Sequence, residues 1–393
     1  ELTSKTATGE PINFLERLQR DGVKVELCHE SWTTLENYWK PGGNEVHMDR
    51  YVQAAKAAGI DCLFYFGFLM SDKIPEFPLY HDLVLTKPNT YPEGGFRPYL
   101  HYRQGDPEQN SFGVCYHSIW GDRFAEGIGE VIRRYDLRGV YYDGTLVPGG
   151  CANTKHGCGV VDPYGRLVVT FPVLAYRRLG EIVYATGLKN RSDFIVDHHV
   201  GWPFPPAMGL VEAYWTGEAS FLFEPSHART GPESLRAMMN GKLYGVPCDM
   251  LKRPEPELDV CWAQSLLVDA YPRLTIGGGQ KYLKCMQNVW GLYDTYHLTS
   301  DTFTPYFAKA NKVVKDNPNV FVSYYETDDV LVVVVSNYWS EQPQSVTLDL
   351  SSFAGLKTQF QDVWRTTDFE LVNGKVAMTV DPLFLRLLVI EKH

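Results

Sequence analysis

The sequence predicts an α/β protein: a (β/α)8 TIM barrel over residues 1–315, followed by an all-β sandwich module over residues 316–393. Three observations favour this fold class. Short apolar strands alternate with amphipathic helices through most of the chain, and this order implies a parallel sheet. The length of 393 residues suits a barrel of about 250 residues or more with a smaller module attached. From about residue 320 the helices stop, and short strands separated by turn residues take over.

The barrel elements follow from apolar periodicity and from the residues that end each helix. One helical pattern stops at Gly22 and another at Gly59, as expected at helix C-termini. We predict strands over residues 23–27, 60–66, 112–117, 140–143, 194–196, 210–214, 243–246 and 273–276. We predict helices over residues 11–21, 48–58, 123–135, 172–185, 234–240 and 260–270. Residues 70–111 have no clear period, and we interpret them as a long loop that forms one wall of the site.

The C-terminal module is predicted from six short strands without helices between them. These strands cover residues 320–325, 330–336, 345–350, 359–363, 376–380 and 385–390. Turn residues such as Asn373-Gly374 separate them. A small sandwich packed on the barrel is expected, and a module of this kind is more often structural than catalytic.

Composition excludes several partners. The net charge of −10 argues against nucleic acid or an anionic membrane as the main partner. No apolar run reaches the roughly 18 residues of a membrane helix. The chain starts at Glu1 without a signal-like segment, so targeting is open, with a secreted or periplasmic location slightly favoured. An aromatic content of 13% fits stacking on sugar rings, although a large core explains it equally.

Two acids are the candidate catalytic pair. In a barrel of this type, catalytic groups lie at the C-terminal ends of the strands. Asp143 ends the predicted fourth strand, and Glu218 follows the predicted sixth. Glycosidic cleavage needs an acid for the leaving oxygen and a carboxylate that meets the cationic transition state or activates water, and this pair fits. The alternatives are a turn at Asp143-Gly144 and a helix cap at Glu218.

Other polar and aromatic side chains at strand ends are the candidate sugar-binding residues. Neutral imidazoles can donate to and accept from hydroxyl groups, and aromatic rings can line a sugar pocket. The predicted substrate-binding residues are His29, Trp32, Tyr142, His156, His198, His199, Trp215 and Asp249. Glu30 and Asp249 are further candidate acids, whereas Glu212, inside a predicted strand, is expected to point into the barrel or to anchor a neighbour.

No cofactor or metal is predicted. The sequence has no phosphate-binding G-x-x-x-x-G-K-[ST] loop, no dinucleotide fingerprint and no G-x-S-x-G elbow. Three glycines at 277–279 leave a phosphosugar-binding barrel open as an alternative. Cys151, His156 and Cys158 form a C-x4-H-x-C pattern that matches no common zinc pattern and lacks an evident fourth ligand. Loop packing or a Cys151–Cys158 disulfide is therefore expected ahead of a metal.

Four stretches carry a family resemblance. They are Tyr141-Tyr142-Asp143-Gly144, Cys151-Ala-Asn153-Thr-Lys-His156-Gly-Cys158-Gly, Tyr176-Arg177 and Tyr214-Trp-Thr-Gly217-Glu218. Through them, most of residues 20–390 resembles glycoside-hydrolase-like barrels related to the family 123 N-acetyl-β-galactosaminidases. That family uses an adjacent Asp-Glu pair after strand four, with the substrate acetamido group as nucleophile. Here Gly144 follows Asp143, so the pair is absent and this mechanism cannot be carried over.

The placement of the acids looks closer to clan D α-galactosidases. Those enzymes resemble this chain in having a nucleophilic Asp after strand four and an acid/base after strand six. The resemblance implies a retaining glycoside hydrolase with Asp143 as nucleophile and Glu218 as acid/base, acting on an α-linked galactose-type or N-acetylhexosamine-type sugar of an oligosaccharide or glycoconjugate. The alternatives are an inverting or acetamido-assisted glycosidase and a non-catalytic carbohydrate-binding barrel.

Overall fold

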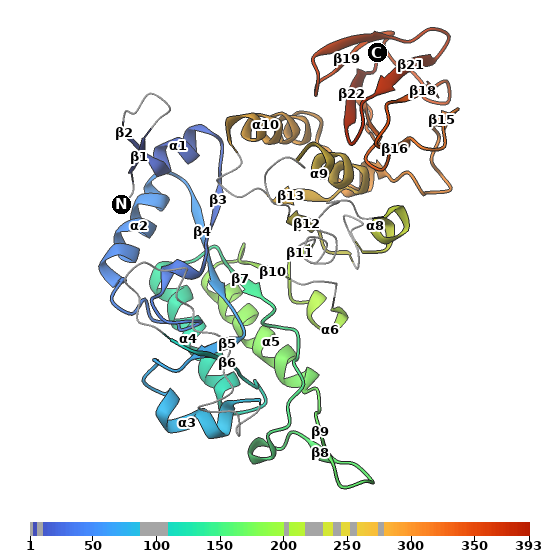
Figure 1. Ribbon diagram of the computed structural model, residues 1–393. Helices are drawn as coiled ribbons and strands as arrows, with labels where there is room; N and C mark the ends of the chain where they lie inside the picture. Colours follow the sequence, from blue (N-terminus) through green and yellow to red (C-terminus); the bar gives the residue numbers. More distant parts are fainter. Residues whose placement is uncertain are drawn as a thin grey trace. The chain divides into compact units, whose positions relative to one another are not determined.

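The computed structural model describes residues 3–5, 11–86, 109–199, 204–216, 231–238, 245–251, 258–273 and 279–393. The chain divides into two compact units, and the division falls between Ala213 and Tyr214 (Figure 1). The predicted boundary at 315–316 lies inside the second unit and stays a prediction. Within the described ranges, no helix has the length and apolarity to cross a membrane.

The first unit is built on four parallel strands in the order β10-β7-β4-β3. Their bounds are β3 Val25–Cys28, β4 Asp61–Phe66, β7 Gly139–Asp143 and β10 Ile195–His199. The helices of this unit are α1 Phe14–Arg20, α2 Glu45–Ala57, α3 Phe77–Val84, α4 Ile119–Tyr135, α5 Val173–Asn190 and α6 Pro205–Met208. The alternation of strand and helix confirms the predicted parallel α/β arrangement.

Helix α4 shows how the sequence fixes one of these elements. It begins earlier than predicted because Ser118 caps its N-terminus and accepts a hydrogen bond from the Trp120 amide. Phe124, Ile128 and Ile132 recur at helical spacing, and all three are buried. Helix α5 lies beside α4, so the two helices cover one face of the sheet together (Figure 1).

The predicted third strand, residues 112–117, is wrong as a barrel strand. Strand β6 (Ser111–Gly113) pairs antiparallel with β5 (Leu69–Ser71) in a separate two-stranded sheet. The Asp72 carboxylate accepts hydrogen bonds from the amide and the side chain of Asn110, which hold the two segments together. In the parallel sheet of this unit, β7 is therefore the third strand in chain order and not the fourth.

Two small antiparallel pairs also belong to the first unit. Strands β1 (Thr3–Lys5) and β2 (Pro11–Asn13) form an antiparallel pair at the N-terminal end of the unit. Between β7 and α5, strands β8 (Val160–Val161) and β9 (Leu167–Val168) form a small hairpin. This hairpin was not predicted from the sequence.

The second unit contains three further parallel strands and the C-terminal β-module. The parallel strands are β11 Ala213–Thr216, which belongs to this unit from Tyr214 onward, β12 Cys248–Leu251 and β13 Tyr271–Arg273. The helices are α8 Pro232–Met238, α9 Leu258–Ser265 and α10 Gly279–Tyr296. Residues 241–244 and 274–278, on which parts of the predicted seventh and eighth strands fall, lie outside the described residues.

The C-terminal β-module has two antiparallel sheets around one core. The sheets have the orders β14-β16-β17-β22-β19-β20 and β15-β18-β21. All six predicted strands are present, as β16 Phe321–Glu326, β17 Val330–Ser336, β18 Gln344–Asp349, β19 Gln359–Asp362, β21 Lys375–Val380 and β22 Leu385–Glu391. Three were missed: β14 Phe303–Thr304, β15 Val314–Lys315 and β20 Thr367–Glu370. The fold class, an α/β domain with C-terminal antiparallel β-sheets, is confirmed.

Candidate active site

The candidate active site lies at the C-terminal ends of the parallel strands in the first unit. In parallel strands, residues in register point to the same face of the sheet, and residues along one strand alternate between faces. His199 is in register with Asp143, and Tyr65 is in register with Tyr141, two positions before Asp143. Asp143, His199 and Tyr65 therefore share one face, which we call the site face.

The Asp143 carboxylate is held on both oxygens. His199 Nδ1 lies 2.9 Å from Asp143 Oδ1, and the Tyr65 hydroxyl donates to Oδ2 at 2.9 Å. The Asp143 side chain keeps 32% of its surface exposed, compared with 12% for His199. A fixed carboxylate that still reaches solvent is suited to attack on a bound molecule or to stabilise a positive charge on it.

The surroundings of Asp143 keep its carboxylate ionised. Burial alone would raise the pKa of Asp143. The hydrogen bond and charge of His199, the hydroxyl of Tyr65 and the charge of His29 outweigh burial and lower this pKa below its ordinary value. An ionised carboxylate is the form required of a nucleophile, whereas a general acid requires a raised pKa.

Tyr65 donates its proton to Asp143 and does not lose it. Burial, followed by the negative charges of Asp143, Glu30 and Glu36, raises the pKa of the Tyr65 hydroxyl far above its ordinary value. The ring of His29 lies 4.7 Å from the Tyr65 ring, measured between centroids. The His29 side chain is half exposed, so it lies at the open side of the site face.

Gly144 makes the turn that ends β7 beside Asp143. Its φ of +65° is in the left-handed region, and its amide donates to the carbonyl of His199 at 3.1 Å. A Cβ at this position would lie 3.2 Å from the Phe68 ring. The Asp-Gly turn weighed from the sequence is therefore real, and it locks the end of β7 to the end of β10.

We expect Gly144→Ala to destabilise the protein by about 1–3 kcal/mol, because alanine is strained at this φ and crowds Phe68. Gly149→Ala is the matched control, since open space surrounds Gly149 in the same loop. This control should change stability by less than about 0.5 kcal/mol. Urea unfolding of both variants measures the difference, and equal stabilities would contradict the role given to Gly144.

Trp32, Tyr142 and His198 are corrections to the predicted site. Tyr142 and His198 are in register with one another on the opposite face, and both are fully buried. Trp32 is 2% exposed; its indole donates to the Tyr65 carbonyl at 2.8 Å, and its ring packs on Phe64 and Phe66. Since none of the three offers surface to a ligand, we withdraw them from the sugar site.

Neutral His198 fits this buried position. Burial first, and then the neighbouring charge of His199, lowers the pKa of His198 to about 3. Its ring lies 6.2 Å from that of Tyr142 in an edge-to-face contact. Both side chains pack in the core. Because side chains alternate between faces along β7 and β10, Tyr142 and His198 lie on the face opposite to Asp143 and His199.

His156 also lies elsewhere. Its Nε2 is 3.1 Å from the Cys151 sulfur, and its Nδ1 is 2.6 Å from the Leu83 carbonyl oxygen. The structure thus places His156 in a cluster of sulfur ligands and not beside Asp143. We withdraw it from the sugar site as well.

The remaining predicted residues belong to the second unit or lie outside the described residues. Trp215 is buried on β11, in register with the half-buried Asp249 on β12. Glu218 lies outside the described residues, so its role stays a prediction. Glu212 accepts a hydrogen bond from the Val196 amide at 2.6 Å, which confirms that it anchors a neighbouring strand.

Sequence reasoning missed three residues of the site face: Tyr65, Tyr141 and Asp197. Asp197 is 3% exposed and in register with Tyr141. The signal that could have found them is the alternation of side chains along a strand. Tyr141 and Asp197 lie two positions before Asp143 and His199, and Tyr65 is in register with Tyr141. Because β4 and β10 pair with β7 in parallel register, side chains of all three strands lie on this face.

Comparisons with known proteins show a distant likeness in structure. A maltogenic alpha-amylase from Thermotoga neapolitana has a TM-score of 0.59 at 11% identity, over 96% of this chain and 93% of that one. A GH27 β-L-arabinopyranosidase from Geobacillus stearothermophilus has a TM-score of 0.57 at 10% identity, over 96% and 90%. A GH36 alpha-galactosidase from the same organism has a TM-score of 0.57 at 12% identity, over 96% and 52%.

These likenesses show the fold alone: an α/β domain with a parallel sheet, followed by C-terminal antiparallel β-sheets. No protein-family model and no curated protein matches the sequence. The activity must therefore be argued from the site itself.

Proposed function

We propose that this protein is a retaining glycoside hydrolase in which Asp143 is the nucleophile. The observation that carries the proposal is the ionised, strand-end carboxylate of Asp143, held by His199 and Tyr65 at an accessible edge of the sheet. The fold, shared in outline with glycoside hydrolases, supports it. We propose an α-linked galactose-type or N-acetylhexosamine-type sugar as the substrate.

The contacts of Asp143 suit covalent catalysis. The transition state of glycosidic cleavage carries positive charge at the anomeric carbon, and an ionised carboxylate stabilises this charge before it forms the glycosyl ester. Two hydrogen bonds fix the orientation of the carboxylate, so little reorganisation is needed during attack. His29, half exposed and next to Tyr65, is placed to bind a sugar hydroxyl.

A retaining mechanism also needs an acid/base residue, and we propose Glu218. It would protonate the leaving oxygen and then activate water. Within the described residues Glu30 is the rival acid, because its charge acts on the same Tyr65 hydroxyl as that of Asp143. Asp249 remains a proposed contact to the rest of the substrate, whereas Trp215 is buried in the same way as Trp32 and would need its surroundings to open before it could contact a sugar.

The two acids can be separated by leaving-group dependence. Loss of the acid/base should spare cleavage of a dinitrophenyl glycoside, whose leaving group needs no proton, and abolish cleavage of a natural linkage. We expect this pattern in Glu218→Gln and not in Glu30→Gln. The reverse result would assign the acid/base to Glu30.

The activity itself is tested with aryl glycosides of both anomers, with product stereochemistry followed by NMR. The proposal expects an α-glycoside to be cleaved with retention of configuration. Inversion would assign Asp143 to activation of water instead of attack. Activity confined to β-N-acetylhexosaminides would indicate the acetamido-assisted route. Glycan binding without hydrolysis of any substrate would indicate a carbohydrate-binding barrel.

Tyr65→Phe is expected to move the acidic limb of the pH profile. The Tyr65 hydroxyl stabilises ionised Asp143 and so lowers its pKa. Without it, the pKa of Asp143 rises, and the acidic limb of kcat/KM shifts to higher pH. We also expect kcat/KM at neutral pH to fall about 10- to 100-fold, the typical worth of a hydrogen bond to a charged group.

Tyr51→Phe is the control for this change. Tyr51 also donates its hydroxyl to a carboxylate, that of Glu26, on the opposite face of the sheet. Its pH profile should match that of the unmodified protein. An unchanged acidic limb in Tyr65→Phe would show that Asp143 does not control this part of the profile.

A further inference from the structure

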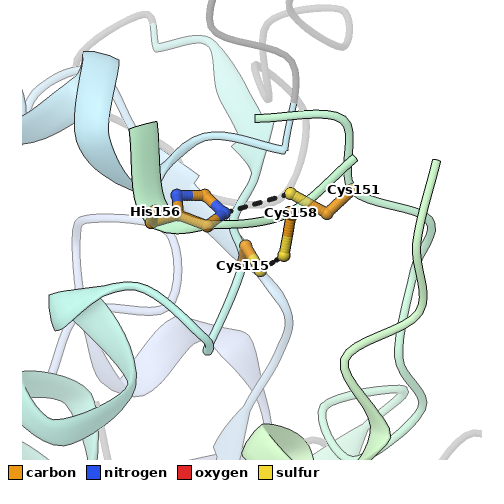
Figure 2. Close-up of side chains that lie close together, drawn as sticks. All are labelled: Cys115, Cys151, His156 and Cys158. Atoms are coloured by element: carbon orange, nitrogen blue, oxygen red, sulfur yellow. Dashed lines mark hydrogen bonds between the residues drawn. The ribbon is translucent and has the colours of Figure 1, made fainter. Parts of the chain in front are cut away.

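Four side chains that can bind a metal gather apart from Asp143. Figure 2 shows Cys115, Cys151, His156 and Cys158 pointing toward one another. Their ligand atoms all lie within 4.8 Å of one another. The three cysteines are at most 2% exposed, and His156 is partly exposed. The sequence pattern lacked a fourth ligand, and Cys115, from the segment after β6, now supplies it.

The sulfur spacing fits a tetrahedral metal better than a disulfide. Cys115 Sγ and Cys158 Sγ are 3.8 Å apart. Two thiolates bound to one tetrahedral zinc at about 2.3 Å each lie about 3.8 Å apart. A disulfide requires about 2.05 Å between the sulfurs. Cys151 and Cys158 are free thiols in the structure, so of the two alternatives weighed from the sequence, loop packing and a disulfide, the disulfide is absent.

His156 is oriented as a metal-bound histidine is. Its Nδ1 lies 2.6 Å from the Leu83 carbonyl oxygen, so the ring proton belongs on Nδ1. Nε2 then carries the lone pair, and it faces the Cys151 sulfur at 3.1 Å. Histidine ligands of metals commonly donate their other N–H to a backbone carbonyl in this way, which fixes both the tautomer and the ring orientation.

The backbone holds the ligands in place without help from the metal. Cys151 exchanges two hydrogen bonds of 2.9 Å with Thr170. Asn153 donates to the carbonyls of Asp82 and Leu85 at the end of α3, at 3.0 Å and 2.8 Å. Gly157, with φ +83°, turns the chain between His156 and Cys158. This rigid scaffold lowers the entropy cost of bringing four ligands together.

Binding of a divalent cation would release the protons of the three thiols.

We propose that Cys115, Cys151, His156 and Cys158 form a structural zinc site. Three thiolates and one imidazole are a donor set that zinc takes in closed, four-coordinate sites, and thiolate ligands disfavour magnesium and calcium. Since all four positions come from the protein, the metal would have no open position for catalysis. The site connects the loop between β7 and α5 to Cys115 in the segment after β6, and through His156 to the Leu83 carbonyl at the end of α3. This loop begins beside Asp143. It is independent of the proposed glycosidase activity.

Metal analysis of the full chain, purified under reducing conditions without chelator, tests this proposal. We expect about one zinc per chain, bound through all three thiols. Replacement of zinc by cobalt should give the visible spectrum of tetrahedral cobalt with thiolate charge-transfer bands. Removal of the metal by a chelator should lower the melting temperature, and added zinc should restore it.

Variants identify the ligands. Cys115→Ser and Cys158→Ser should each weaken zinc affinity by more than about 100-fold. Cys62→Ala is the matched control, because Cys62 is also buried in the first unit but lies on β4 outside the cluster. It should keep its zinc. If the serine variants fail to fold, the cobalt spectrum of the unmodified chain still decides the question.

A chain that is isolated without metal and binds neither zinc nor cobalt with its thiols reduced would overturn the proposal. A Cys115–Cys158 disulfide found by mass spectrometry in protein prepared without oxidant would also overturn it. Neither readout depends on hydrolysis, so the zinc site and the proposed function succeed or fail separately.

Discussion

Asp143→Asn should abolish glycoside hydrolysis and leave the fold intact. Asparagine matches aspartate in size, so it can keep a hydrogen bond with Tyr65, but it cannot form the glycosyl ester or balance positive charge on the sugar. We expect kcat to fall by at least about 10⁴-fold, as is typical when a nucleophile is removed. Steady-state kinetics on the best aryl glycoside measure this loss, and circular dichroism checks the fold.

Asp162→Asn is the control for this prediction. Asp162 belongs to the same β7–α5 connection, and its carboxylate accepts hydrogen bonds at the surface from Arg166. Its removal should leave kcat unchanged. In addition, a 2-fluoro glycoside with a good leaving group should label the unmodified enzyme on the peptide that contains Asp143. A fully active Asp143→Asn enzyme, or a label on another acid, would rule out the assigned role.

Trp32→Ala should cause the largest loss of stability among single changes near the site. Trp32 fills the core behind the site face, between Phe64 and Phe66, and its indole donates to the Tyr65 carbonyl. Truncation leaves a cavity of most of an indole and an unpaired carbonyl. We expect a loss of about 3–5 kcal/mol in the free energy of unfolding.

Chemical denaturation measures this loss, with Trp339→Ala as the control. Trp339 is 45% exposed, so its truncation should cost less than about 1 kcal/mol. Because the Trp32 indole supports the strand that carries Tyr65, catalytic activity of the folded fraction should also fall. A Trp32→Ala protein as stable as the control would return Trp32 to the sugar pocket, where it was first predicted.

The catalytic proposal and the zinc proposal meet in one connection of the chain. The segment between β7 and α5 starts at Gly144, whose amide is bonded to the His199 carbonyl. Farther along, Cys151, His156 and Cys158 fasten it to Cys115. Contacts therefore hold this connection at its start, Gly144, and again at residues 151–158.

Several features were predictable from the chain alone. The apolar run that ends at Asp143, the Asp-Gly turn and the six strands of the C-terminal module are local patterns of periodicity and turn chemistry. Such patterns depend on neighbours in sequence, so a single sequence contains them. The prediction of a barrel strand at residues 112–117 was wrong because β6 pairs with β5. Most of β5 falls in the segment 70–111, which has no periodic pattern, so no pattern in the sequence indicated this pairing.

What the tertiary structure decided is which side chains meet. Strand register brings His199 and Tyr65 to Asp143, while the same alternation turns Tyr142 and His198 into the core. Contact between Cys115 and the C-x4-H-x-C loop depends on pairing far apart in sequence, so the fourth ligand had no local signal. The sequence by itself determined that Asp143 ends its strand and that Gly144 turns the chain after it. Only the tertiary structure decided that His199 and Tyr65 contact Asp143, because these residues come from other strands.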